Sequence, residues 1–299
     1  MSAVIRHLNI AINGKPIVDD VDLDIADGER VGLVGSSGSG KSMIARAMMG
    51  LLPATAQVTG SVELGGTQIV GASDAAVADL RGRYVGMVFQ NPSAALNPVM
   101  TVAQQVGLPL YLHYDLSLAE RSERVTAVLA KVGLGEDVLV KYPHELSGGQ
   151  RQRVGIARAL VMNPKLIIAD ECISALDMSI QAQVVNLMKD IQDETGLAYL
   201  FIAHDLSMVK YISDRIGVLH LGYLLETGTT EEIFSHPVHP YTRSLISAIP
   251  NPNPVVERSR IALHYDYKTS GLDYGAGTMH QIEGTHFVRG TDADLEKWV

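Results

Sequence analysis

The chain has 299 residues, of which 46% are hydrophobic and 19% charged, so it can bury a core and is not disordered as a whole. Its net charge of −9 argues against a broad basic face for nucleic acid. The single cysteine, Cys172, excludes an intrachain disulfide and fits a reducing cytoplasm.

The start of the chain and its apolar runs bear on targeting. Residues 1–6 lead directly into a strand-like segment and lack the apolar stretch of a signal peptide. No apolar run approaches the about 18 residues needed to span a bilayer. We therefore expect any role at a membrane to depend on another protein.

Strand patterns dominate the chain up to residue 90. Residues 4–12 and 17–25 alternate around a turn at 13–16, which predicts an antiparallel hairpin. A second hairpin is predicted around Gly65-Gly66. The strands predicted in this part are 4–12, 17–25, 30–34, 59–64, 67–70 and 84–89, and the helices are 43–51 and 72–80.

The pattern changes after residue 90. A turn-rich loop at 91–98 precedes helical patterns from 101 to about 162, after which strands and helices alternate. This order predicts an α/β fold with a parallel sheet covered on both faces, interrupted by a helical subdomain at about 92–162. The later strands are predicted at 166–169, 198–202 and 215–219, and the helices at 180–194 and 205–212.

The last part of the chain differs again. A turn at 236–241 and a short helix to residue 249 precede a proline-rich linker at 250–254. We predict that the linker divides a domain at 1–250 from an accessory segment at 251–299, where we find no strong period.

The stretch from Gly35 to Ser42 fits the phosphate-binding P-loop pattern and lies between a predicted strand and a predicted helix. Its glycines allow successive N–H groups to point inward as an anion nest, and the helix N-terminus adds its positive dipole. Lys41 is expected to reach the β- and γ-phosphates of ATP, and the Ser42 hydroxyl to bind Mg²⁺. The predicted nucleotide-binding residues are Gly35, Ser36, Ser37, Gly38, Ser39, Gly40, Lys41 and Ser42.

Two acidic residues, Asp170 and Glu171, end the apolar strand at 166–169. Strand ends of a parallel sheet meet at the edge where open α/β folds bind ligands. Asp170 can hold Mg²⁺ through water, and Glu171 can polarise an attacking water as a general base. An alternative is a solvated strand cap, which the P-loop in the same chain makes the weaker interpretation.

The five residues from Leu146 to Gln150 open a helix inside the predicted insertion. Ser147 is a suitable N-cap, and Gly148 and Gly149 leave backbone N–H groups uncovered. Together with Gln150 they form a second anion-binding helix start. Because it belongs to the insertion, it need not reach the P-loop of its own chain.

In order and spacing, these motifs resemble the ATP-binding subunits of ABC transporters over about residues 4–250. The resemblance implies a P-loop NTPase (RecA-like) core with an antiparallel β subdomain and an inserted α-helical subdomain. The motifs that carry it are the P-loop, Gln90, Leu146 to Gln150, Asp170-Glu171, Ser174-Ala175-Leu176-Asp177 and His204.

The family resemblance also assigns roles. It implies that Gln90 lies at the metal and the γ-phosphate and couples to the membrane subunit, and that Asp177 lies in a loop that crosses a dimer. His204, which follows the apolar strand at 199–202, is implied to contact the γ-phosphate. The predicted catalytic residues are therefore Lys41, Gln90, Glu171 and His204, and the metal ligands are Ser42, Gln90 and Asp170.

Three segments give a narrower resemblance to the peptide and nickel importer branch. They are Phe89 to Pro98, Gln181-Ala182-Gln183 and His239 to Pro250. The branch implies a peripheral ATPase at the cytoplasmic face of the membrane that powers uptake of peptides or a related solute such as nickel. The implied partners are a second ATPase subunit, identical or paralogous, two integral-membrane permease subunits and, indirectly, a solute-binding protein, with no nucleic acid.

The location of the signature at Leu146 to Gln150 predicts how two ATPase domains meet. We expect them to close head to tail, so that each ATP lies between Lys41 of one domain and Ser147 of the other. ATP hydrolysis would then use Mg²⁺, Lys41 and Glu171 for in-line attack by water.

The chain departs from the family pattern at two places. The family usually has an aromatic residue near the end of the first strand to stack on adenine, but here Ile12 and Asn13 occupy that position. Cys172-Ile173 stand where the branch usually has Pro-Thr, and we interpret Cys172 as a small buried apolar residue. No cysteine follows it, which excludes the iron–sulfur cluster found in some members.

Three other functions are compatible with parts of this sequence. A non-transport ATPase of the same superfamily would act in DNA repair or translation, against which the acidic charge and the loop at 91–98 speak. A nucleotide kinase would leave Leu146 to Gln150 unexplained. A catalytically weak regulatory subunit would fit the missing aromatic but not the intact Glu171 and His204.

Overall fold

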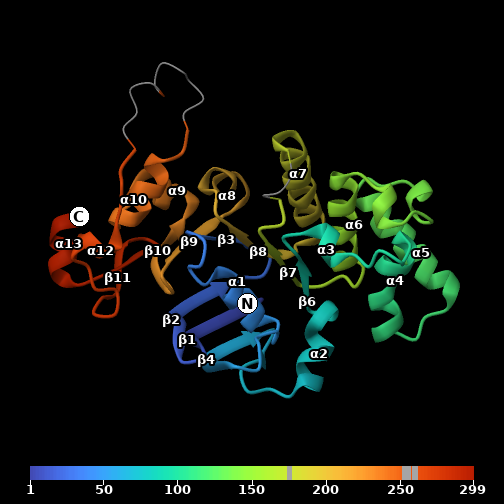
Figure 1. Cartoon of the computed structure of the whole chain (residues 1–299), viewed down its shortest axis with the longest axis horizontal. Coiled ribbons are helices and arrows are strands. Elements are labelled where there is room, and N and C mark those ends of the chain that lie inside the picture. The colour runs from blue at the N-terminus through green and yellow to red at the C-terminus, as the bar shows by residue number, and fades with distance from the viewer. Residues whose placement is uncertain (174–176, 251–256, 258–261) are drawn as a thin grey trace.

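Two sheets and an inserted group of helices make up the chain (Figure 1). The structure, a computed structural model, describes residues 1–173, 177–250, 257 and 262–299. No helix within these ranges is long and apolar enough to cross a membrane.

The smaller sheet is antiparallel and has the strand order β2-β1-β4-β5. β1 pairs with both β2 and β4, so the predicted first hairpin is confirmed, and so is the second, although β5 is short. This sheet is separate from the one that carries the P-loop strand. The strands are β1 (Ala3–Ile12), β2 (Lys15–Ile25), β4 (Ala56–Leu64) and β5 (Thr67–Gln68).

The larger sheet has the order β11-β12-β10-β9-β3-β8-β7-β6. Strands β9, β3, β8, β7 and β6 are parallel, as predicted for the core. Three antiparallel strands extend it, so the sheet is mixed. The bounds are β3 (Arg30–Val34), β6 (Val85–Val88), β7 (Leu166–Asp170), β8 (Ala198–Ala203), β9 (Arg215–His220), β10 (Tyr223–Thr229), β11 (Thr278–Glu283) and β12 (His286–Gly290).

The central strands are buried because helices and the smaller sheet pack against them. In β3, Val31, Leu33 and Val34 are fully buried, which is why this strand is almost continuously apolar. Gly32 lies against α8, where a Cβ would come within 2.2 Å of Val209 Cγ1. The helices of the core are α1 (Lys41–Met48), α2 (Asp74–Arg83), α7 (Met178–Thr195), α8 (Leu206–Ile212), α9 (Thr230–Ser235) and α10 (Pro240–Ser247).

The insertion is helical, as predicted, and lies on one side of the parallel strands (Figure 1). Its second and third helices begin with capping boxes at Thr101 and Ser117, in which side chain and backbone exchange hydrogen bonds. The helices are α3 (Pro92–Ala95), α4 (Val102–His113), α5 (Leu118–Lys131) and α6 (Gly148–Leu160).

The C-terminal segment is built into the larger sheet, which we did not predict from the sequence. β11 and β12 form a hairpin, and β12 pairs with β10 through Glu226 and Val288. The alternation in residues 278–290 around the Glu283-Gly284 turn is a signal that we missed. Two short helices, α12 (Tyr267–Ser270) and α13 (Asp292–Trp298), complete this part.

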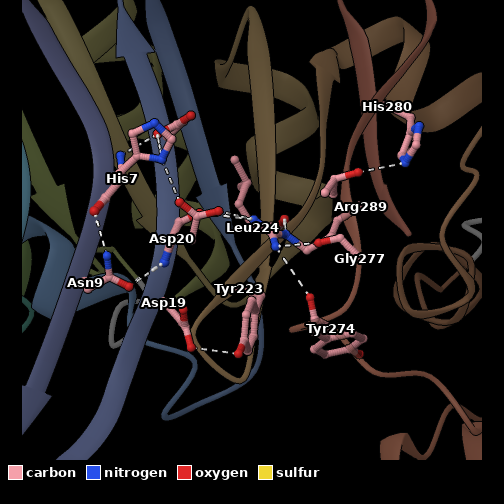
Figure 2. Close-up of polar contacts among 12 residues, drawn as sticks. His7, Asn9, Asp19, Asp20, Tyr223, Leu224, Tyr274, Gly277, His280 and Arg289 are labelled. Atoms are coloured by element: carbon pink, nitrogen blue, oxygen red, sulfur yellow. Dashed lines mark hydrogen bonds and ion pairs between the residues drawn. The ribbon is translucent and has the colours of Figure 1, made fainter. Parts of the chain in front are cut away.

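Arg289 of β12 ties the C-terminal hairpin to the smaller sheet (Figure 2). Its side chain is 6% exposed, and its guanidinium donates to the carbonyls of Gly277 (2.9 Å) and Asp20 (3.1 Å) and to the Asp20 carboxylate (3.3 Å). Further bonds reach Leu224 O and Tyr274 O. One buried cation thus satisfies carbonyls from several segments.

We predict that Arg289→Gln lowers the free energy of unfolding by about 3 kcal/mol, because buried carbonyls lose charge-assisted hydrogen bonds. Urea unfolding of the full chain measures this. Arg6→Gln is the control, since Arg6 pairs with Asp24 at the surface and should change stability by less than about 1 kcal/mol. Equal effects of the two variants would contradict the anchoring role of Arg289.

Candidate active site

The P-loop joins β3 to α1 and turns through two glycines that no other residue could replace without strain. Gly35 has φ of 156° and lies so close to β9 that a Cβ would come 1.9 Å from Leu219 O. Gly40 has φ of 105° at the N-cap of α1, and its Cβ would meet Ile17 O at 2.9 Å. The loop is therefore held tightly between β9 and β2.

Lys41 is 4% exposed and lies inside the loop that it follows. Its ammonium donates to the carbonyls of Gly35 (2.9 Å) and Ser36 (2.8 Å) and to the Ser39 hydroxyl (3.3 Å). Burial lowers the pKa of Lys41, while the nearby charges of Glu171 and Asp170 oppose that shift. The cation is thus placed within the loop that would surround the phosphates.

Asp170 ends β7 and meets the start of α1. The Ser42 hydroxyl donates to Asp170 Oδ1 at 2.9 Å, which joins two residues that are 128 positions apart. Asp170 is 9% exposed, and burial raises the pKa of its carboxyl, against the hydrogen bond from Ser42. A hydroxyl and a carboxylate are hard oxygen donors of the kind Mg²⁺ uses beside phosphates, so this pair fits the predicted metal site.

Glu171 follows immediately and has an unusual backbone. Its φ is +44°, in the left-handed region that a non-glycine residue seldom adopts, and its N–H donates to Ile202 O of β8 at 2.9 Å. Gln90, two residues after β6, donates from Nε2 to Glu171 Oε2 at 2.8 Å. The bond engages the amide nitrogen of Gln90, so the amide oxygen is the atom suited to a cation.

His204 follows β8, the strand next to β7. It is exposed, and it lines a small cavity of about 60 Å³ together with Glu171, Cys172 and Gln181. The parallel order of β3, β8, β7 and β6 thus brings Lys41, His204, Asp170-Glu171 and Gln90 to one edge of the sheet.

The predicted signature lies in the helical insertion. Ser147 caps α6, accepting from Gln150 N at 3.2 Å, while Ser147 N donates to Gln150 Oε1 at 3.0 Å. Gly149 lies against α7, where a Cβ would come 3.1 Å from Ile180 Cγ2. Within the described residues, no hydrogen bond or ion pair joins this helix start to the P-loop, and Figure 1 shows α6 and α1 in different parts of the molecule.

Comparisons with known proteins agree with this arrangement. A family model described as ABC transporter matches residues 18–174, and one described as oligopeptide/dipeptide transporter, C-terminal region, matches 225–265. The dipeptide transport ATP-binding protein DppF of Lactococcus lactis is 49% identical over 98% of this chain and 95% of its own. The oligopeptide transport ATP-binding protein OppF of Bacillus subtilis is 50% identical over 93% and 91%.

The chain belongs to the ATP-binding proteins of ABC transporters. This confirms the predicted family. Among solved structures, a dimeric post-hydrolysis ATP-binding cassette with ADP and Pi (MJ0796) matches with a TM-score of 0.68 and 30% identity over 76% of this chain and 98% of its own. The cbiO1 structure from Clostridium perfringens matches with a TM-score of 0.70 and 28% identity over 78% and 90%. These likenesses confirm the predicted P-loop NTPase fold.

Asp177 and the position expected to contact adenine are the two remaining predicted features of this ABC protein. Asp177 is the exposed N-cap of α7, but Ser174, Ala175 and Leu176 lie outside the described residues. At the position expected for an adenine-stacking aromatic, Ile12 ends β1 half-buried and Asn13 turns the chain with φ of 50°. Neither residue at this position can therefore stack on adenine, as the sequence indicated.

Cys172 packs in the core of this ABC protein, as we interpreted from the sequence. It is 2% exposed, and burial raises the pKa of its thiol to about 12. The thiol therefore stays protonated at neutral pH and behaves as a small apolar group.

Asp170 gives a prediction about stability against pH. Its folded pKa lies above the unfolded value of 3.8, so its contribution is most favourable at low pH and is lost as pH rises through the folded pKa. At pH 7, above the unfolded pKa, the burial that raises this pKa is a cost, and Asp170→Asn should stabilise the chain. The gain should shrink as pH falls through the unfolded pKa of 3.8 and be nearly absent at pH ~2.5, where the carboxyl is protonated in both states.

Urea unfolding at several pH values measures this difference. An Asp170→Asn gain that stays constant from pH 7 to ~2.5 would show that burial of the charge is not its source. Asp177→Asn is the matched control, because Asp177 is exposed at a helix start.

Proposed function

We propose that this chain is the ATP-hydrolysing subunit of an importer for peptides or a related small solute. The observation that carries the proposal is the pair of contacts from Ser42 to Asp170 and from Gln90 to Glu171, beside the P-loop. The relatives are named dipeptide and oligopeptide transport ATP-binding proteins, and they match this chain over nearly its whole length. The described contacts also speak against a catalytically weak regulatory subunit.

Each residue at the sheet edge has a distinct task in this proposal. The P-loop N–H groups and Lys41 hold the β- and γ-phosphates, and Ser42 and Asp170 hold Mg²⁺, which neutralises charge on the phosphates when bound. Glu171 takes the proton of the attacking water, oriented by Gln90. His204, which lines a cavity together with Glu171, contacts the γ-phosphate.

A second ATPase subunit completes each ATP site. The capped start of α6 offers N–H groups for phosphate, as anion-binding helix starts do. It lies in the insertion and makes no polar contact with the P-loop of its own chain within the described residues. The solved relatives include dimeric cassettes. We infer that Ser147, Gly148, Gly149, Gln150 and Asp177 act on the ATP of the facing subunit, identical or paralogous.

A groove beside Gln90 suits the membrane partner. It encloses about 710 Å³ between the core and the insertion, and Phe89, Gln90 and Arg158 line it. Phe89 is 41% exposed, an apolar ring at the surface next to a residue that contacts Glu171. We propose that each of two permease subunits docks in such a groove at the cytoplasmic face of the membrane, with a solute-binding protein on the other side.

The base assignment predicts the effect of Glu171→Gln. ATP turnover should fall by about 10² to 10⁴-fold, since the amide cannot accept the proton, while ATP binding persists and a closed dimer accumulates. Steady-state ATPase assays, ATP binding and size-exclusion chromatography with ATP measure the three effects. Glu194→Gln, at a surface ion pair with Lys131, is the control. Turnover retained by Glu171→Gln would rule out the base assignment.

The docking groove predicts a separate loss. Phe89→Asp should abolish co-purification of the tagged chain with an integral-membrane permease, because a charge replaces the exposed ring, while ATP binding is kept. Leu118→Asp, at a 78% exposed position on α5, is the control and should retain the permease. Membrane extraction followed by mass spectrometry identifies the co-purified subunits. A permease that stays bound to Phe89→Asp would place the interface elsewhere.

A further inference from the structure

The P-loop receives a hydrogen bond partner from the C-terminal part of the chain. Ser36 N–H donates to the Tyr241 hydroxyl at 2.9 Å, between residues 205 positions apart. Tyr241 is only 6% exposed and stands in the first turn of α10. Because Ser36 lies at the start of the loop, this bond leaves the backbone N–H groups from Gly38 onward available to bind phosphates.

The aromatic ring of Tyr241 is fixed from the side of β9. It stacks on His220, with ring centroids 4.1 Å apart and an interplanar angle of 21°. His220 Nδ1 in turn lies 2.9 Å from the hydroxyl of Tyr274, which belongs to the C-terminal segment. The turn that follows His220 contacts the P-loop directly, because Gly222 N–H donates to Ser39 O at 3.1 Å.

The backbone of Tyr241 is fixed by His239, which is fully buried. His239 Nδ1 accepts from Tyr241 N–H at 3.0 Å, which requires a neutral imidazole nitrogen. Burial lowers the pKa of His239 to about 3, so the ring is neutral at physiological pH and can accept this bond.

A buried carboxylate holds the turn before Tyr241. Glu226 of β10 is fully buried and accepts from Val238 N–H (2.7 Å) and His239 N–H (3.0 Å). Its third partner is His286 Nε2 of β12, at 2.7 Å. A buried carboxylate is costly unless its oxygens are hydrogen-bonded, so this arrangement resists displacement.

These bonds form one continuous path. It runs from His286 in the C-terminal hairpin through Glu226 and His239 to Tyr241, and from the Tyr241 hydroxyl to Ser36 in the P-loop. Every link connects side chains or backbone groups that are buried or partly buried, where hydrogen bonds are strongest. A chain of hydrogen bonds therefore links the C-terminal hairpin to the nucleotide-binding loop.

We propose that Tyr241 is a positioning residue for ATP, and that the C-terminal hairpin orders the P-loop through Glu226, His239 and the Tyr241 hydroxyl. This inference rests on the proposed function in one respect, that the P-loop holds ATP. An anion nest binds phosphate well only when its N–H groups are already aligned, because ordering a loose loop on binding costs conformational entropy. Tyr241 supplies this alignment without touching the nucleotide.

The test is Tyr241→Phe, which removes the hydroxyl and keeps the stacked ring. We expect the full chain to bind MgATP about three- to tenfold more weakly, the range for loss of one neutral hydrogen bond. The KM for ATP should rise by the same factor with kcat nearly unchanged, because the loop holds substrate and transition state alike. Hydrogen exchange in the peptide that contains Ser36 should become faster.

Tyr211→Phe is the matched control. Tyr211 is 57% exposed, and its hydroxyl donates to Asn186 and not to the P-loop. The affinity for MgATP and the hydrogen exchange of the Ser36 peptide should therefore match those of the wild type. Tyr241→Phe with wild-type ATP affinity would overturn the proposal, and so would a change equal to that of Tyr211→Phe.

Glu226→Gln tests the path to the hairpin. The amide cannot accept both backbone N–H groups and His286 as the carboxylate does, so ATP affinity should fall in the same direction as in Tyr241→Phe. The double variant should be no weaker than the weaker single variant, because both changes break one path. Additive losses would show that Glu226 does not act through Tyr241.

ATP binding by the wild type distinguishes failure of the proposed function from failure of the positioning role of Tyr241. If the wild-type chain does not bind MgATP, the proposed function fails. Suppose instead that the wild type binds MgATP and that Lys41→Ala abolishes this binding. If Tyr241→Phe then leaves the affinity for MgATP unchanged, only the positioning role of Tyr241 fails.

Discussion

The close packing of the P-loop against the end of β9 and the turn that follows it is the constraint on which the site depends. Gly35 meets Leu219 O with no room for a Cβ, and Gly222 N–H holds Ser39 O. Lys41 is buried inside the loop and bonds its carbonyls. A phosphate site made of backbone N–H groups gains affinity from being ordered in advance, and these contacts provide that order.

The parallel sheet then brings charge to the ordered loop. Because β3, β8, β7 and β6 lie side by side in one direction, the residues that follow each strand converge at one edge. Burial there raises the pKa of Asp170 and lowers that of Lys41, because removal from water disfavours the charged form of each group. Glu171, with φ of +44°, holds a left-handed backbone conformation that costs free energy for a non-glycine residue.

The C-terminal segment is an integral part of the larger sheet. β12 continues the sheet, Arg289 bonds the smaller sheet, and Glu226 joins His286 to the turn before Tyr241. Such a segment gives the nucleotide site a physical link to whatever contacts the hairpin. That the second family model matches residues 225–265, around Tyr241, is in keeping with a role specific to this branch.

The sequence by itself determined the P-loop, the order of the strands up to residue 220, the helical nature of the insertion, the signature at Ser147 and the family. It did not predict α3, which lies within the predicted loop at 91–98. The predicted features rest on local patterns: glycines at fixed spacing, apolar strands that end in acids, and caps that begin helices. Only the tertiary structure decided that Ser42 bonds Asp170, that Gln90 bonds Glu171 and that Tyr241 bonds Ser36. Those contacts join residues 81 to 205 positions apart, and no local pattern encodes which distant strand ends and turns the folded sheet brings together.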